Sequence, residues 1–545
     1  MNLYNLAQSG LSSAQAAMNV VGNNLTNGMT PGYSRQSIIL GEAGGRTTGS
    51  GFFGYGVQVN GVQRAYNGFV NNQLRGAYTE SSSQVGRYQQ LTQINNMLGD
   101  DTSNISTSLN SIFKSLEEIS ADPVSQAARQ GALSQFKAIS YQFNTQSNTL
   151  NGLEKSTNTQ ISQSVSDINA DAKQLAKLNE EIARIHGRTG DLPADLLDQR
   201  DALLERLSTQ VGIKVNENTT TGRVDVTLSN GMPLVNGDRS YQLEAFASDE
   251  DPSKTVVAYV DASGNKMLLD EDKMSGGKLG GLFKFRNEDL VDARNQLNQL
   301  ALQMANRFNE VNAAGFDLDG NPGGDIFNIA DPTALANRGN TGDSSLDVSF
   351  SDISKVKSED YTLTFKGPND TDWEVTTADG RTINPTVGTN GELEFDGVSI
   401  KPQGTPQAGD SFVMNPTAGA AGKISVAITK GDQIAASSVK GEESNNENIK
   451  DMLAIKTETL IGNGTLTEAY SSLVSSVGSS MKALEADNET TSKAAAAIEF
   501  EKQSVSGVDL TEETVKFQMY TQYYQANAQV LQAANTLFDT LLSLR

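Results

Sequence analysis

The chain begins MNLYNLAQSGLSSAQAAMNVVGNNLTNGMTPGYSR (Met1–Arg35), and no side chain before Arg35 is charged. Apolar residues recur at alternating spacings of three and four, which is typical of a coiled-coil seam. They are Tyr4, Ala7, Leu11, Ala14, Met18, Val21 and Leu25. Gly10 and Gly22 each cost such a helix about 1 kcal/mol relative to Ala. We therefore expect this segment to be helical only when its apolar face is buried.

The other end of the chain carries a matching pattern. Asp509, followed three residues later by Glu512, is typical of a capping box, and a helix is predicted from Leu510 to Leu544. The seam residues that are predicted to form an assembly interface at this end are Phe517, Tyr524, Ala528, Leu531, Phe538 and Leu542. Both ends could be ordinary core helices of one domain. The broad apolar faces with little charge favour instead ends that pair with each other and with other copies.

The middle of the chain alternates between helical and β-like patterns. Helices are expected over residues 67–210, including one that opens after Asp122-Pro123 and carries Ala127, Leu133, Phe136 and Ile139, and one from Ile161 to Leu207 that is broken at Gly187–Pro193. Short alternating segments with Asn-Gly turns at Asn230-Gly231 and Asn236-Gly237 predict strands after Val211. A second β-rich block is expected from Leu346 to Ile428.

The predicted fold class is α+β multidomain, with terminal coiled-coil helices, a helical rod domain formed by both chain halves and two β-rich insertion domains. The expected boundaries are 1–62 with 506–545 for the terminal helical domain, 63–210 with 284–342 and 431–505 for the rod, and 211–283 and 343–430 for the insertions.

Composition excludes several classes of function. The 545 residues include 42 Lys+Arg against 65 Asp+Glu, a net charge of −23, with no Cys and one His. The acidic balance argues against nucleic acid as a partner, because phosphate contacts need clustered Lys and Arg. Without Cys there are no disulfides and no thiolate metal sites. We expect no cofactor, no cleaved signal peptide and no membrane insertion.

One segment has the look of a calcium loop. Asp317–Asp325 is rich in Asp, Asn and Gly, but its sixth residue is Pro322 where Gly is needed, and its twelfth is Asn328 where Glu is needed. A polar turn is therefore predicted here, and no metal site.

Candidate catalytic groups are equally weak. His186 is expected near a helix end at Gly187, and no Gly-x-Ser-x-Gly elbow accompanies it. The paired carboxylates Asp198 and Asp201 are expected on a solvated or salt-bridged helix face, with Arg200 and Arg206 as nearby partners. No catalytic residue is assigned, and the chain is not expected to be an enzyme.

Both ends carry recognisable motifs. Ser9–Met18, Asn23–Asn27 and Thr30–Gln36, together with Ser506–Glu513 and Tyr524–Leu531, resemble the two terminal signatures of flagellar rod, hook and hook-associated proteins. The inner segments narrow the resemblance to the hook-associated proteins of the hook–filament junction. These segments are Asp122–Gln130, Leu196–Asp201 and Ala314–Asp317.

The resemblance implies a structural part of the bacterial flagellum that is exported by the flagellar type III system and located outside the cell. It implies a ring of copies at the hook–filament junction, with the hook protein and a second junction protein of the hook-associated family as partners. A cytoplasmic export chaperone is expected at the C-terminal region. The alternatives are an exported oligomeric adhesin or effector and, less favoured, a carboxylate-dependent glycan-cleaving enzyme in a β insertion.

Overall fold

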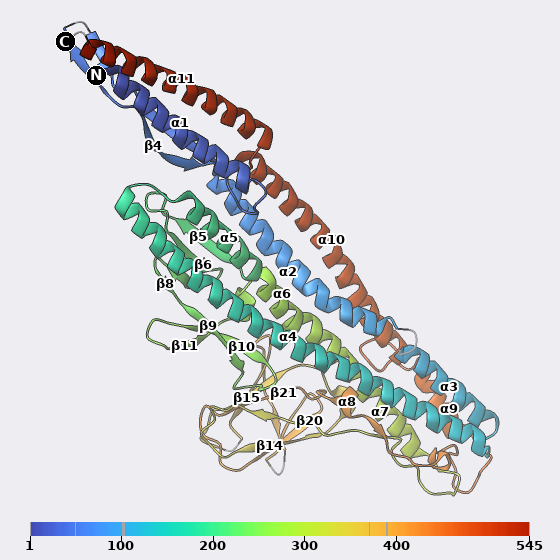
Figure 1. The fold of residues 1–545 in the computed structure, drawn as a ribbon. Helices are drawn as coiled ribbons and strands as arrows, with labels where there is room; N and C mark the ends of the chain where they lie inside the picture. Colours follow the sequence, from blue (N-terminus) through green and yellow to red (C-terminus); the bar gives the residue numbers. More distant parts are fainter. Residues whose placement is uncertain (1, 50, 101–103, 370, 389–390, 544–545) are drawn as a thin grey trace.

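The computed structural model describes residues 2–49, 51–100, 104–369, 371–388 and 391–543. The molecule is elongated, and both chain ends lie at the same tip (Figure 1). The longer helices are α1 (Asn2–Asn27), α2 (Gly68–Leu98), α3 (Ile105–Ala121), α4 (Gln126–Thr189), α5 (Ala194–Gln210), α7 (Leu290–Ala314), α10 (Leu466–Ser506) and α11 (Leu510–Ser543). The short ones are α6 (Gly277–Lys284), α8 (Ala420–Lys423) and α9 (Glu447–Ala454).

The tip is formed by α1 and α11, which run antiparallel, and by a β-ribbon alongside α1 (Figure 1). The ribbon pairs β1 (Gln36–Glu42) with β4 (Val57–Arg64) and ends in the hairpin β2 (Gly45–Thr48) and β3 (Gly51–Gly54). The start of α11 at Leu510 is confirmed, because the Asp509 carboxylate accepts hydrogen bonds from the Thr511 and Glu512 N–H groups.

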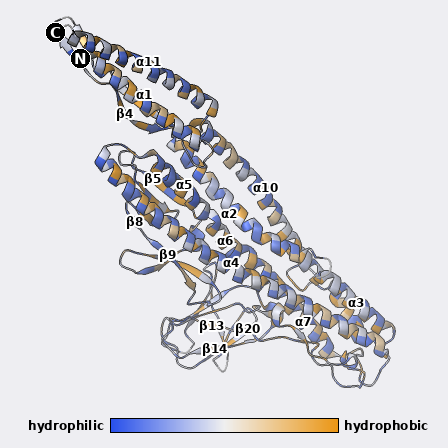
Figure 2. Ribbon diagram, in the orientation of Figure 1, coloured by the Kyte–Doolittle hydropathy of each residue, from blue (hydrophilic) through white to orange (hydrophobic). Residues whose placement is uncertain are grey.

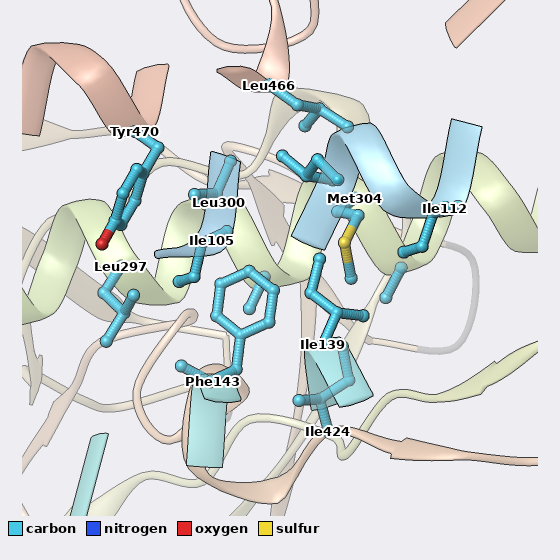
Figure 3. Packing of buried hydrophobic residues seen from close by; sticks show 14 of the residues in the cluster. Ile105, Ile112, Ile139, Phe143, Leu297, Leu300, Met304, Ile424, Leu466 and Tyr470 are labelled. Carbon is cyan, nitrogen blue, oxygen red and sulfur yellow. The ribbon is translucent and has the colours of Figure 1, made fainter. Parts of the chain in front are cut away.

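The rod below the tip is built from both halves of the chain. Helices α2 and α10 pack together along it, and α3, α4, α7 and α9 complete its lower part (Figure 1). Their buried apolar residues form one cluster, the rod core, which Figure 3 shows. The residues labelled in Figure 3 come from α3, α4, α7 and α10 and from Ile424, which follows α8. Side chains more than 300 positions apart in the sequence therefore pack in the same core. They include Ile105, Phe143, Met304, Ile424 and Tyr470. The predicted fold class is confirmed.

Helix α4 is one continuous helix of 64 residues, and Phe143, Leu150 and Leu153 lie on its buried apolar face. The predicted break at Gly187–Pro193 is confirmed, because α4 ends at Thr189 and α5 begins at Ala194. The end of α4 lies two residues beyond Gly187, where it was expected. Gly190 adopts a left-handed conformation with φ 79°, and its N–H donates to the His186 carbonyl at 2.8 Å.

The first β region follows α5. One sheet has the order β5 (Ile213–Glu217), β6 (Val224–Leu228), β7 (Pro233–Asn236) and β8 (Arg239–Ser240). A second sheet has the order β11 (Lys266–Leu268), β10 (Thr255–Val260) and β9 (Gln242–Ala247). The predicted turns at Gly231 and Gly237 are confirmed, and both glycines have positive φ. With α4, α5 and α6 these strands enclose a second apolar core.

The second β region lies between α7 and α9 in the sequence. One sheet has the order β13 (Leu335–Ala336), β21 (Ser411–Met414), β15 (Tyr361–Phe365), β16 (Trp373–Thr377) and β17 (Thr382–Ile383). The other has the order β14 (Ser345–Phe350), β20 (Val398–Gln403), β19 (Leu393–Phe395) and β18 (Thr386–Val387). A third apolar core lies between them, with Trp373 against Phe365 and Phe412. The remaining strands, β12 (Phe327–Asn328) and β22 (Ser425–Val426), pair beside the rod core. The domain boundaries given above stay a prediction.

Candidate assembly interface at the paired chain ends

Helices α1 and α11 approach each other closely because small side chains lie between them. On α1, Ala7, Ala14 and Ala17 are at most 1% exposed. At Gly10, a Cβ atom would lie 2.2 Å from the Asn527 side-chain oxygen, so the helices could not come this close with a larger residue unless Asn527 moved. A contact made from such small residues buries little apolar surface, and the pair therefore gains little stability from it.

The predicted interface residues fall into three groups. Ala7, Ala14 and Val21 are buried within the chain. Five are half-buried, namely Leu11, Met18, Leu25, Ala528 and Leu531. Four are exposed, namely Tyr4, Phe517, Tyr524 and Phe538. Leu542 lies in α11, but its side chain is outside the described part of the structure. The structure thus places the two seams side by side, and it leaves each of the four large aromatic side chains more than a third exposed. The assembly role of these residues stays a prediction.

The outer surface of α11 is uncharged between Phe517 and Phe538, and exposed apolar side chains lie there among exposed glutamines. Met519, Tyr523 and Leu537 are more than half exposed, and no charged residue occurs from Phe517 to Phe538. Figure 2 shows hydrophobic residues recurring along the helices of the tip. An exposed apolar surface of this kind usually marks a site of protein–protein interaction.

The β-ribbon adds exposed aromatic residues that the sequence reasoning did not assign to the interface. Phe52 is 66% exposed and Phe53 48%, and Tyr55 follows them. An isolated two-stranded ribbon is marginally stable in water. The Phe-Phe pair between Gly51 and Gly54 was the available signal, because both large apolar residues lie in one short strand, β3, and both are exposed.

At the base of the tip, the carboxylates Asp198 and Asp201 are salt-bridged, as predicted, but the central partner differs. Arg64 at the end of β4 lies 2.9 Å from Asp198 and 2.7 Å from Asp201, and Arg200 lies 2.8 Å from Asp201. The other predicted partner, Arg206, pairs with Asp171 instead. Burial raises the pKa of Asp198, although hydrogen bonds from Ser34 and Arg64 act in the opposite direction. Arg64 could not be found from spacing, because it is distant in sequence.

The other candidate groups form no metal centre in the described residues. No group of three or more His, Asp or Glu side chains there is placed to hold a metal ion. The loop at Asp317 is a turn, in which the carboxylate accepts the Asn321 N–H at 2.8 Å. None of the helices in the described ranges is long and apolar enough to cross a membrane.

Three models of known protein families match segments of this chain. Residues 91–327 match the flagellar hook-associated protein FlgK helical domain, and residues 335–416 match the D2-like domain of flagellar hook-associated protein 1. Residues 503–544 match the C-terminal region of the flagellar basal body rod FlgEFG proteins. The fold and the paired ends therefore define the class as a structural protein of the bacterial flagellum.

Full-length relatives identify the family. The chain is 41% identical to flagellar hook-associated protein 1 of Salmonella typhimurium and 39% identical to that of Escherichia coli K12, and each match covers 100% of both chains. The solved structure of the flagellar hook junction protein FlgK from Burkholderia pseudomallei matches with a TM-score of 0.72 and 27% identity, over 80% of this chain and 100% of that one. The chain belongs to the flagellar hook-associated protein 1 (FlgK) family, whose members are structural components of the hook–filament junction. The adhesin or effector alternative is not favoured.

Proposed function

We propose that the chain forms a ring of copies at the junction between hook and filament and assembles through α1, α11 and the β-ribbon. The observation that carries this proposal is the set of exposed aromatic residues on α11 and the ribbon, with no charged residue on α11 from Phe517 to Phe538, at the tip that holds both chain ends. Such a surface needs a partner, and identical neighbours in a closed ring supply one for every copy.

Assembly would also complete the folding of the ends. None of the three apolar cores in the described part of the chain contains a residue of α1 or α11. Helices without a core to cover them are marginal in water, so the tip is expected to become stably ordered only among neighbouring copies. This dependence suppresses premature polymerisation before export.

The remaining roles follow from this proposal. The chain leaves the cell through the flagellar type III system without cleavage. The hook protein binds it on one side of the ring, and the second junction protein of the hook-associated family binds it on the other. An export chaperone in the cytoplasm covers the exposed face of α11. The chain acts as a structural part and not as an enzyme.

Deletion of the gene tests the proposed function. Cells without the protein are expected to carry hooks without filaments and to lose flagellin monomer to the medium. The two readouts are electron microscopy of the cell surface and an assay of flagellin in the culture medium. Normal filaments on the deleted cells would contradict the proposal.

A further inference from the structure

We propose that Tyr33–Gln36, here called the joint segment, fixes the angle between the paired terminal helices and the rod. This inference rests on the proposed function, because an angle matters only if the tip is held in a ring while the rod and β regions project from it. The joint segment follows the turn at Thr30–Gly32, whose glycine has φ 81°.

The first three residues of the segment each bond a different helix. The Tyr33 hydroxyl donates to Asn24 Oδ1 of α1 at 2.9 Å. The Ser34 N–H donates to Asp198 Oδ2 of α5 at 2.9 Å. The Arg35 N–H donates to the carbonyl of Ser506, the last residue of α10, at 2.8 Å. One short segment therefore links the tip to both α5 and α10.

Gln36, the last residue of the joint segment, forms hydrogen bonds to both α1 and α5. Its N–H donates to Asn24 Oδ1 at 2.9 Å, and its carbonyl accepts from Asn24 Nδ2 at 2.8 Å. Its side-chain Nε2 donates to Asp195 Oδ1 of α5 at 2.6 Å. Ser34 and Gln36 are both buried, so these bonds are expensive to break without replacement.

Asn24 links the joint segment to the pairing of the terminal helices. It is 0% exposed, and its Nδ2 also donates to Glu513 Oε2 of α11 at 2.8 Å. Glu513 is 1% exposed, and its second oxygen accepts from Lys516 at 2.9 Å. Lys516 lies on α11 itself, whereas Asn24 reaches the Glu513 carboxylate only when α1 and α11 are paired, so pairing of the helices and closure of the joint are coupled.

The joint is held by polar contacts, whereas the rod and the β regions are held by apolar cores. Apolar contacts are non-directional, whereas hydrogen bonds of defined geometry select one orientation. Arg64 extends the network into the rod through Asp198 and Asp201. A chain of directional bonds from α11 to α5 therefore sets one angle rather than a range of angles.

The test is electron cryo-microscopy of hook–filament junctions from cells that carry Asn24→Asp. This change removes both Nδ2 donations and places a second carboxylate against Glu513. The matched control is Asn23→Asp, because the Asn23 side chain accepts only a local bond from Asn27 within α1. We expect the ring of terminal helices to remain, and the density of the rods to lose its fixed angle, in Asn24→Asp alone.

A second variant covers the case in which Asn24→Asp does not enter the junction. Gln36→Met keeps the backbone bonds to Asn24 and loses only the bond to Asp195, and it is expected to loosen the rods in the same way. Rods at the normal angle in every variant that incorporates, or equal loosening by Asn23→Asp, would overturn the inference. Absence of the unmodified protein from the junction would instead overturn the proposed function.

Discussion

Asp410 shows how one buried carboxylate organises a region without an ion pair. It is 2% exposed and accepts the N–H groups of Thr341 at 2.8 Å, Gly342 at 3.1 Å and Gln407 at 2.8 Å. Burial alone would raise the pKa of Asp410, but these backbone donors together outweigh burial and hold the pKa below its usual value. The stability that the carboxylate contributes is therefore present at neutral pH and is lost as the pH falls through this lowered pKa.

Replacement of this carboxylate should destabilise the second β region. Asp410→Asn is expected to lower the free energy of unfolding by about 1–3 kcal/mol at neutral pH. Urea unfolding followed by the fluorescence of Trp373, the only tryptophan, measures this loss. The deficit should shrink as the pH falls below the usual aspartate pKa of about 3.9, because the unfolded chain then binds a proton at this position that the folded wild-type carboxylate, with its lowered pKa, does not yet bind. A deficit that does not depend on pH, or an equal one in the exposed control Asp347→Asn, would contradict this account.

In the rod core, Phe308 is the residue whose replacement we expect to destabilise the structure most clearly. It is fully buried, and its ring centroid lies 5.6 Å from that of Phe136 and 6.2 Å from that of Phe327. Phe308→Ala is expected to cost about 3–5 kcal/mol, because the cavity cannot collapse among packed rings. Helix loss by circular dichroism during urea unfolding measures the cost. The control Phe500→Ala, at a residue 75% exposed on α10, should change stability by less than about 0.5 kcal/mol. Equal effects of the two changes would show that the rod core is not as described.

For single residues, the sequence predicts contacts with near neighbours in the chain better than contacts with distant residues. The salt bridges of Asp201 with its neighbour Arg200 and the turn at Asp317 follow from local spacing. The pairing of Asn24 with Glu513 does not, because 489 positions separate them and only the antiparallel packing of α1 on α11 brings them together. The absence of charge before Arg35 indicated that this segment is buried, but it did not indicate which of its polar residues, such as Asn24, would bond another helix.

At the scale of elements, α11 carries the clearest sequence signal. The capping Asp509 and the heptad spacing predicted its start correctly. The helix break predicted at Gly187–Pro193 is confirmed, since α4 ends at Thr189 and α5 begins at Ala194. The pairing of β12 with β22 was not predicted, since two-residue strands almost 100 positions apart leave no periodic pattern.

The apolar stripe of α11 gives the element-scale prediction. Leu531→Asp is expected to block incorporation into the junction while the rod and β regions stay folded, because a charge would have to be buried against a neighbour. The matched control is Gln532→Asp, which places the same charge at the adjacent exposed position. Electron microscopy of filaments and the urea unfolding curve of each variant measure the two effects. Normal filaments with Leu531→Asp would show that this stripe is not an interface.

At the scale of the whole molecule, the distribution of charge separates two kinds of structure. The net charge of −23 lies almost entirely outside the two terminal segments, and all three cores of the described residues lie in the rod and β regions. The sequence predicted this division because charge and periodicity are visible along the chain. It could not predict the ribbon's place beside α1 or the joint at its base, which depend on packing between distant segments.

The central claim is that the tip becomes stably ordered only in the assembled junction. Limited proteolysis of the same protein, as dilute monomer and in isolated flagella, tests the claim most directly. The account predicts that monomer is trimmed at both ends, with α1 and α11 removed and a resistant piece containing the rod and β regions left behind. In flagella the chain should stay full length under the same treatment. A monomer whose α1 and α11 resist cleavage as well as they do in flagella would contradict the account.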